Sequence, residues 1–190
     1  MIKDLVAKNR SCRRFHQDSP ITLDTLRELV DLARLSASAG NQQPLKYLLS
    51  YDPGKNADIF STLAWAAALK DWPGPSVGER PSAYIVILED TGLSNPWLKF
   101  DIGIAAQSIL LGATEKGLGG CMIASVQSEK LRGKLAIPEH LEISLVVALG
   151  KPKEEVVVEA IGPSGNINYW RDDKGVHYVP KRRLDDIIIE

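Results

Sequence analysis

Residues 36–44 read Ser36-Ala37-Ser38-Ala39-Gly40-Asn41-Gln42-Gln43-Pro44, and the segments on either side make sense as supports for this stretch. It contains no acid, base or strong nucleophile. Its small side chains let the backbone approach a flat ligand closely, and its amides both donate and accept hydrogen bonds. Asn41 and Gln43 therefore suit the edge of a heterocycle. A plain polar connection is the alternative, because Ser, Asn, Gly and Pro gather in such loops.

The segments that flank this stretch predict a helix before it and a strand after it. Thr22 is a candidate N-cap, and apolar residues then recur at the helical period, namely Leu23, Leu26, Leu29, Val30 and Ala33. Residues 45–51 favour a strand. The stretch therefore joins a helix to a strand.

Basic residues cluster near both ends of the chain. Residues 2–9 have near-helical apolar spacing and lead into Arg10-Ser11-Cys12-Arg13-Arg14-Phe15. On a helix or tight turn Arg10 and Arg13 share a face, where together with Ser11 they could bind a phosphate. A solvated basic patch is the alternative. Lys181, Arg182 and Arg183 form the second cluster.

A long helix is predicted between Asn95-Pro96, which suit an N-cap and a first helical residue, and Gly117, which suits a C-terminal cap. Apolar residues cover most of its circumference, so we expect it to be buried against more than one layer. A dimer interface would supply the second cover, and a monomer core helix is the alternative.

The other segments predict further strands, helices and an irregular region. Residues 83–88 and 143–150 are apolar runs typical of buried strands, residues 121–125 predict a central strand, and residues 126–135 an amphipathic helix. Residues 56–70 suit a helix within a Pro- and Gly-rich region, 52–82, which is either a flap over a site or a surface crossover. Residues 169–171 and 176–179 suit a hairpin.

Composition restricts the class of protein. The chain has 190 residues, of which 44% are hydrophobic, enough for one domain with a real core. The net charge of −1 gives no global field that would attract nucleic acid or a membrane. Two cysteines and no signal-peptide pattern indicate the cytoplasm. The three histidines are isolated, so we expect no metal site.

Two cationic clusters and an amide-rich loop of small residues suit a ligand with an anionic end and a planar polar end, as in a flavin mononucleotide. Arg10-Ser11-Cys12-Arg13-Arg14-Phe15 and Ser38-Ala39-Gly40-Asn41-Gln42-Gln43-Pro44 resemble two motifs of the FMN-dependent nitroreductase family. Residues 101–126 and Lys181-Arg182-Arg183-Leu184 resemble its central helix with the following strand and its last phosphate-binding cations.

The resemblance implies an α+β, three-layer fold: a mixed, mostly antiparallel sheet flanked by helices, with the long central helix buried at a homodimer interface. Residues 1–190 would form one FMN-binding domain, in which 52–82 would be a flap and 164–190 a C-terminal extension that would wrap the partner subunit. Carried over by position, the FMN-binding residues would be Arg10, Ser11, Arg13, Ala37, Ser38, Ala39, Asn41, Gln43, Ala124, Ser125, Lys181 and Arg182.

The resemblance also implies an activity. NADH or NADPH would give a hydride to FMN, and a small acceptor such as a nitroaromatic or a quinone would then take the electrons by a ping-pong mechanism. No catalytic side chain is expected, because the cofactor performs the chemistry. A flavin carrier or sensor without turnover is one alternative, and a specialised flavin enzyme of the same fold, acting in dehalogenation or flavin breakdown, is another.

Overall fold

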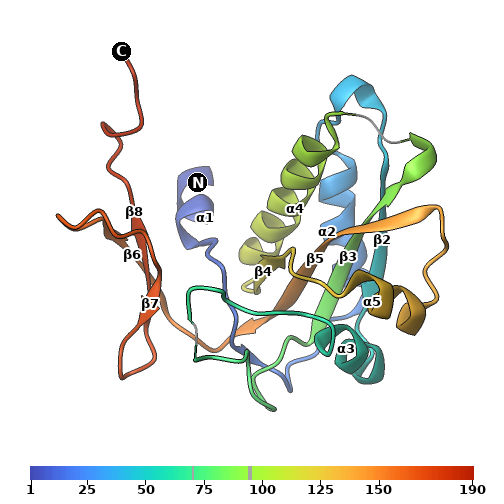
Figure 1. Cartoon of the computed structure of the whole chain (residues 1–190), viewed down its shortest axis with the longest axis horizontal. Coiled ribbons are helices and arrows are strands. Elements are labelled where there is room, and N and C mark those ends of the chain that lie inside the picture. Colours follow the sequence, from blue (N-terminus) through green and yellow to red (C-terminus); the bar gives the residue numbers. More distant parts are fainter. Residues whose placement is uncertain (70, 94–95) are drawn as a thin grey trace.

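A computed structural model of the chain describes residues 1–69, 71–93 and 96–190 and shows three layers, with helices on both faces of a central sheet (Figure 1). The elements, in chain order, are α1 (Ile2–Lys8), β1 (Phe15–His16), α2 (Leu23–Arg34), η1 (Ala39–Asn41), β2 (Leu45–Ser50), α3 (Pro53–Phe60), β3 (Ala83–Asp90), η2 (Thr91–Leu93), α4 (Leu98–Glu115), β4 (Gly119–Ile123), α5 (Ser128–Leu135), β5 (Leu141–Pro152), β6 (Val156–Ala160), β7 (Trp170–Arg171) and β8 (His177–Lys181). The predicted α+β class is confirmed.

The main sheet has β3 and β5 at its centre. Its strand order is β1-β5-β3-β2, β4 also pairs with β5, and all of these pairs are antiparallel. The strand predicted at residues 121–125 is therefore present with shifted bounds, but the prediction that it is a central strand is wrong. The strand lies at Gly119–Ile123, and on its far side the described chain makes one parallel bridge, from Gly120 to Ser11. The central strands, β3 and β5, are the longer apolar runs, because such strands can be covered on both faces.

Alternating residues of the central strands build two cores. Ile85 and Ile87 pack with α2 and α4, whereas Tyr84 and Val86 face the opposite way, toward Ile59 and Leu131 of α3 and α5. Successive side chains of a strand point to opposite faces, so one apolar run serves both helical layers. The prediction of a strand covered on both sides is confirmed.

Helix α2 starts as predicted, since the Thr22 hydroxyl accepts a hydrogen bond from the backbone N–H of Thr25 at 3.2 Å. It packs closely on α4 because Gly112 has no side chain: a Cβ there would lie 2.2 Å from Cδ1 of Leu32. Gly117 ends α4 with a positive φ of 72°, as predicted. The predicted cap Asn95 lies outside the described residues, and α4 begins at Leu98.

One face of α4 is left uncovered by residues 1–69, 71–93 and 96–190 of its own chain. Phe100 is 63% exposed and Ile104 is 40% exposed, and a Cβ on the neighbouring Gly103 would meet no atom within 4 Å. The opposite face carries Ala105, Ala106 and Ile109, all of them buried. The described residues of a single chain thus do not supply the second cover expected for this helix.

The helix predicted at residues 56–70 is shorter and lies earlier, at Pro53–Phe60. Asp52 caps its start, with its carboxylate accepting from the N–H of Lys55 at 2.9 Å. The helix ends because the next residues pair elsewhere: Leu63 bridges to Val126, and Ala64 N–H donates to the carbonyl of Ser125 at 3.0 Å. Lys70, within the predicted helix, lies outside the described residues.

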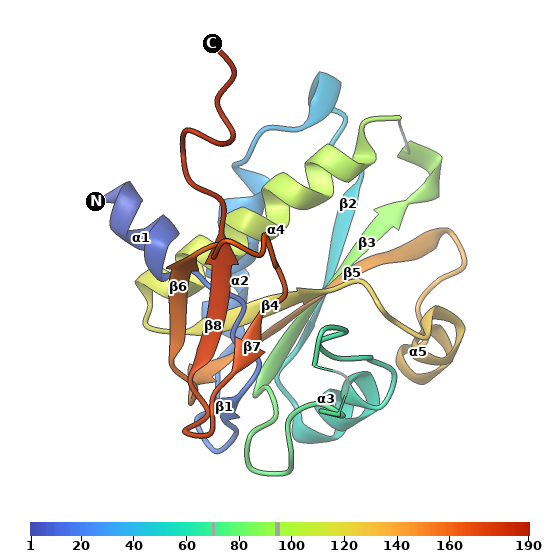
Figure 2. The ribbon, with the colours of Figure 1, turned by 60° about the vertical axis from the view of Figure 1, so that its left-hand side comes forward.

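Strands β6, β8 and β7 form a second, smaller sheet beside the main body (Figure 2). The predicted hairpin is confirmed, since β7 pairs antiparallel with β8 in the register Trp170↔Tyr178 and Arg171↔His177. β6 pairs with β8 in parallel. Within the described part of the chain, no helix is long and apolar enough to cross a membrane.

Candidate functional site

The N-terminal basic segment lies beside β4 rather than on a helix. The chain leaves α1 at Lys8, Ser11 forms its bridge to Gly120, and the N–H of Cys12 donates to the Gly120 carbonyl at 3.0 Å. The prediction that Arg10 and Arg13 share a face, on a helix or tight turn, is therefore wrong. They line separate cavities: Arg13 lies with Ala124 and Ser125, and Arg10 with Lys8 and Cys12.

Two nearby arginines have their charge neutralised by carboxylates. Arg14 forms a two-pronged contact with Glu79, from Nε at 2.9 Å and from Nη2 at 2.6 Å, and this hydrogen bonding is the main reason that the pKa of Glu79 falls to about 2. Arg171 donates from Nη2 to Glu154 at 2.7 Å. Both contacts are partly or fully shielded from water, so neither arginine offers a free charge to a ligand.

The guanidinium groups of Arg13 and Arg10 have uncharged partners instead of carboxylates. Its Nη1 lies 3.3 Å from Nε2 of His177, and its guanidinium lies over the Tyr169 ring, 4.8 Å from the ring centroid. Arg10 donates from Nη2 to the carbonyl of Val6 at 2.7 Å. Among the described residues neither guanidinium forms an ion pair, so both remain available to an anion.

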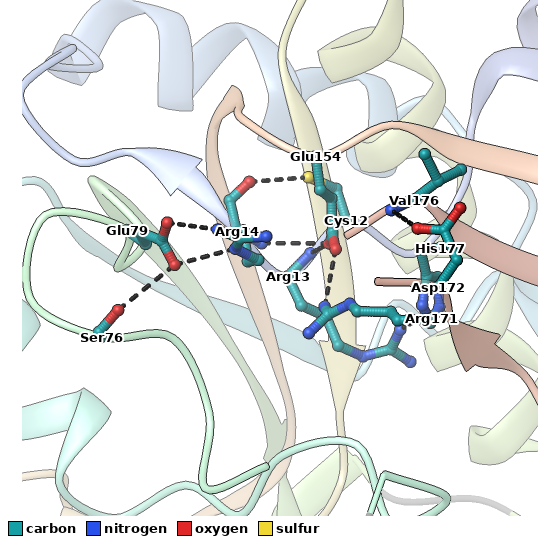
Figure 3. A network of polar contacts seen from close by, with 10 residues as sticks. All are labelled: Cys12, Arg13, Arg14, Ser76, Glu79, Glu154, Arg171, Asp172, Val176 and His177. Carbon is teal, nitrogen blue, oxygen red and sulfur yellow. Dashed lines mark hydrogen bonds and ion pairs between the residues drawn. The ribbon is translucent and has the colours of Figure 1, made fainter. Parts of the chain in front are cut away.

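A buried carboxylate fixes the backbone of this segment (Figure 3). The side chain of Glu154 is fully buried, and its Oε1 accepts from the backbone N–H groups of Arg13 and Arg14, the latter at 3.1 Å. Its Oε2 accepts from Arg171. One side chain thus joins the N-terminal motif to the C-terminal sheet.

His177 is a buried neutral partner of Arg13. It is fully buried, and burial is the main cause that lowers its pKa to about 4. A guanidinium only donates, so Nε2 of His177 accepts from Arg13 and the ring proton sits on Nδ1. Within residues 1–69, 71–93 and 96–190, Nδ1 has no hydrogen-bond partner.

The Arg13 cavity has a volume of about 270 Å³. Its walls come from the N-terminal segment, the loop after α3, the end of β4 and the C-terminal hairpin, and they comprise Arg13, Ala64, Trp65, Ala66, Ala67, Met122, Ile123, Ala124, Ser125 and Tyr169. Small residues dominate the wall formed by the loop and by Ala124 and Ser125, so the backbone there is accessible to a flat ligand.

The loop of small residues is held by another buried carboxylate. Asp101, which is 3% exposed, accepts from the Ser38 hydroxyl at 2.8 Å and from the Ala39 N–H at 2.9 Å. The backbone then turns through positive φ values at Gly40 (58°), Asn41 (53°) and Gln43 (51°). This conformation leaves Asn41 and Gln43 exposed.

The structure places the predicted site residues in several groups. Ala37, Ser38 and Gln43 line a cavity of about 100 Å³ next to Asp101, whereas Ala39 and Asn41 lie in the adjoining turn η1. Neither this cavity nor the Arg13 cavity includes residues of the other, and neither includes Lys181 or Arg182, which lie exposed at the end of β8 and just after it. A single chain therefore does not bring the two motifs together.

Sequence reasoning missed the side chains that hold these motifs, namely Asp101, Glu154, Glu79 and His177. A lone acid inside an apolar helix is a usable signal for Asp101, but nothing in Lys151-Pro152-Lys153-Glu154-Glu155 distinguishes the buried acid from its exposed neighbour. Cys12 is a structural thiol: burial is the main cause that raises its pKa to about 12, and its Sγ lies 3.3 Å from the Arg14 carbonyl.

Comparison with known proteins identifies the family of this chain, because the profile of the nitroreductase family matches residues 6–151. The chain belongs to the nitroreductase family. A relative from Archaeoglobus fulgidus, named for NADH dehydrogenase and NAD(P)H nitroreductase, is 29% identical over 75% of this chain and 80% of its own length. The NADH dehydrogenase of Thermus thermophilus is 26% identical over 89% and 95%.

A solved structure has the same fold as this nitroreductase-family chain. The FMN-dependent nitroreductase of Clostridium difficile superposes with a TM-score of 0.66 at 23% identity, over 87% of this chain and 94% of that one. The predicted family, the fold and the enzyme class of an NAD(P)H oxidoreductase are thus confirmed.

Proposed function

We propose that this chain is an FMN-dependent oxidoreductase that takes a hydride from NADH or NADPH and passes it to a small acceptor such as a nitroaromatic or a quinone, in two alternating half-reactions. The observation that carries the proposal is Arg13, a guanidinium without a carboxylate partner in the described chain, at the wall of a cavity whose other walls combine small residues with apolar and aromatic side chains. FMN is the cofactor named for the similar enzyme of C. difficile.

The residues present fit this cofactor. Arg13 would hold the phosphate together with Ser11, whose side chain is exposed, and Arg10, Lys181 and Arg182 would add positive charge around it. FMN supplies hydride transfer when bound. The exposed backbone at Ala124 and Ser125 offers amide groups to a ring in the cavity, and Trp65 and Met122 add apolar surface to its walls.

A homodimer would complete the site. The exposed stripe of Phe100 and Ile104 on α4, with the open surface at Gly103 between them, suits close packing against a second copy. We propose that this second copy brings its Ala37, Ser38, Ala39, Asn41 and Gln43 to the Arg13 cavity.

The end of the chain supports the same assembly. Leu184, Ile187, Ile188 and Ile189 are each at least 51% exposed, an apolar surface that its own chain leaves uncovered. The extension at 164–190 would therefore pack in part on the partner subunit. Both cysteines are free thiols, which suits the cytoplasm.

FMN titration of the wild type and of Arg13→Ala tests the cofactor site. Loss of one charge-assisted hydrogen bond should weaken FMN binding by about tenfold to a hundredfold. Arg27→Ala is the matched control, because Arg27 lies exposed on α2 and outside the cavity. Equal FMN affinity in all three proteins would remove Arg13 from the site.

Anaerobic addition of NADH or NADPH to the FMN-loaded protein tests the activity. An oxidoreductase bleaches its flavin absorption promptly and recovers it when a quinone is added. A stable flavin band in the presence of both nucleotides would instead identify a carrier or sensor.

A further inference from the structure

A cavity of about 310 Å³ is separate from the site proposed for FMN. It lies between the loop after β1, helix α3 and the segment that leads into β3, and we call it the Arg80 cavity. Within the described chain it shares no lining residue with the Arg13 cavity or with the cavity next to Asp101. Its volume is at the lower end of the range of about 300–1,000 Å³ that is usual for small-molecule sites.

Unpaired polar groups surround the Arg80 cavity. Arg80, Ser82 and Tyr84 line it, and Nε of Arg80 and the two hydroxyl groups are buried without a hydrogen-bond partner in the part of the chain that the structure describes. Ser82 is 8% exposed and Tyr84 is fully buried. A buried polar group that stays unpaired destabilises the folded state, so three of them around one cavity point to a molecule that the cavity binds.

The polar neighbours of these groups are already paired. The Ser50 hydroxyl donates to Oδ1 of Asn56 at 2.7 Å, and Nδ2 of Asn56 donates to the Ser82 carbonyl at 2.7 Å. The side-chain oxygen of Gln17 accepts from the backbone N–H of Arg80 at 3.3 Å. These contacts hold the walls of the cavity in place and leave the three unpaired groups for a ligand.

The Arg80 guanidinium has no carboxylate partner among the described residues. It lies over the Phe60 ring, 4.1 Å from the ring centroid. Burial raises the pKa of Tyr84, so its hydroxyl keeps its proton at neutral pH. A guanidinium only donates hydrogen bonds, and the hydroxyl protons of Ser82 and Tyr84 can rotate toward a common acceptor. The ligand should therefore carry a negatively charged acceptor.

We propose that the Arg80 cavity binds a small organic molecule with one carboxylate group and an apolar body. The carboxylate would accept from Arg80, Ser82 and Tyr84, because its two oxygens offer about four acceptor positions. The apolar body would lie against Pro20 and Pro53, which also line the cavity. This proposal does not depend on the proposed function, since the Arg80 cavity and the Arg13 cavity have separate walls.

A negative charge at the rim restricts the kind of anion. Asp18 lines the cavity, is exposed, and forms no ion pair with the residues that the structure describes. Its carboxylate repels a second negative charge on the ligand. A singly charged carboxylate should therefore bind more tightly than inorganic phosphate, which carries more than one negative charge at neutral pH.

Titration of the FMN-loaded protein with butyrate, followed by NMR of the backbone amides, tests the site. We expect shifts at the amides of Gln17, Arg80 and Ser82. Tyr84→Phe and Arg80→Gln should each raise the Kd for butyrate about tenfold to a hundredfold, the loss of one hydrogen bond to a charged group. Lys55→Gln is the matched control, because Lys55 is exposed on α3 outside the cavity, and it should leave the Kd unchanged.

The choice of anion is a second measurement on the same protein. Inorganic phosphate should bind more weakly than butyrate to the wild type, and Asp18→Asn should narrow this difference about fivefold. Phosphate that binds the wild type as tightly as butyrate would overturn the assignment of the ligand as a carboxylate.

Three results would overturn the site itself. Absence of butyrate-induced shifts at the three amides would show that the cavity takes up water only. Shifts confined to Ala124 and Ser125 would assign butyrate to the Arg13 cavity. Equal Kd values in wild type, Tyr84→Phe and Arg80→Gln would show that these side chains do not bind the carboxylate.

Thermal unfolding without butyrate separates a binding role of the Tyr84 hydroxyl from a structural one. Because this hydroxyl has no hydrogen-bond partner in the described chain, Tyr84→Phe should have the same Tm as the wild type or a higher one. If Arg80→Gln fails to fold, Tyr84→Phe decides alone. A lower Tm in Tyr84→Phe together with an unchanged Kd for butyrate would give the hydroxyl a structural role and overturn its part in binding.

Discussion

Replacing Glu154 tests the central structural claim, that one buried carboxylate holds the N-terminal motif to the C-terminal sheet. Glu154→Ala removes the acceptor of two backbone N–H groups, those of Arg13 and Arg14, and leaves the Arg171 guanidinium, which is 14% exposed, without its carboxylate. Removing one partner of a buried ion pair costs about 3–5 kcal/mol. We therefore expect a loss of about 4 kcal/mol in the free energy of unfolding, equivalent to a fall in Tm of about 8–16 °C.

Urea unfolding followed by circular dichroism at neutral pH measures this loss. Glu154→Gln retains an oxygen acceptor but not the charge, so it should lose about 2 kcal/mol. Glu155→Ala is the matched control, because Glu155 is exposed, and it should stay within about 0.5 kcal/mol of wild type. Equal unfolding midpoints for Glu154→Ala and Glu155→Ala would refute the structural role of Glu154.

Two further predictions concern His177 and Asp101. The folded-state pKa of His177 is about 4, below its ordinary 6.5, so its contribution to stability is present above pH 6.5 and is lost as the pH falls toward 4. The loss should be about 3 kcal/mol, and His177→Gln should flatten the unfolding free energy between pH 6.5 and 4.5, above the range where Glu79 starts to protonate. Asp101→Asn weakens charge-assisted bonds to Ser38 and Ala39, so the Ala39 amide should exchange its hydrogen faster, on the order of tenfold. Glu115→Gln on the same helix should leave that exchange rate unchanged, and equal rates in the two variants would contradict the anchoring role of Asp101.

Local patterns were sufficient to predict much of the fold. The apolar period and the Thr22 cap predicted α2, the continuous apolar runs predicted β3 and β5, and Gly117 predicted the end of α4. These signals depend on residues close in sequence, so they can be recognised without knowledge of the tertiary structure. The predicted helix at 56–70 failed because the pairing of Leu63 with Val126 ends α3, and such distant pairing leaves no local signal.

The candidate site was predicted only in part, for the same reason. The types of residue at Arg13, Ser38 and Asn41 pointed to a ligand with an anionic end and a planar polar end, but their arrangement depends on distant partners. Glu154 lies 141 positions from Arg13, and its charged neighbours in sequence gave no sign of which acid is buried. The prediction that Arg10 and Arg13 share a face is wrong because their segment runs alongside β4, where the Cys12 N–H donates to the Gly120 carbonyl.

Arg13 and His177 are in contact although they lie 164 positions apart, so their contact can form only late in the synthesis of the chain. The N-terminal basic segment leaves the ribosome well before the residues that fix it. Until β8 has been synthesised, Arg13 has neither His177 nor the Tyr169 ring beside it. Contacts of such long sequence separation form late and slowly. A nascent or C-terminally truncated chain should thus hold a nearly complete central sheet while the surroundings of Arg13 are still unformed.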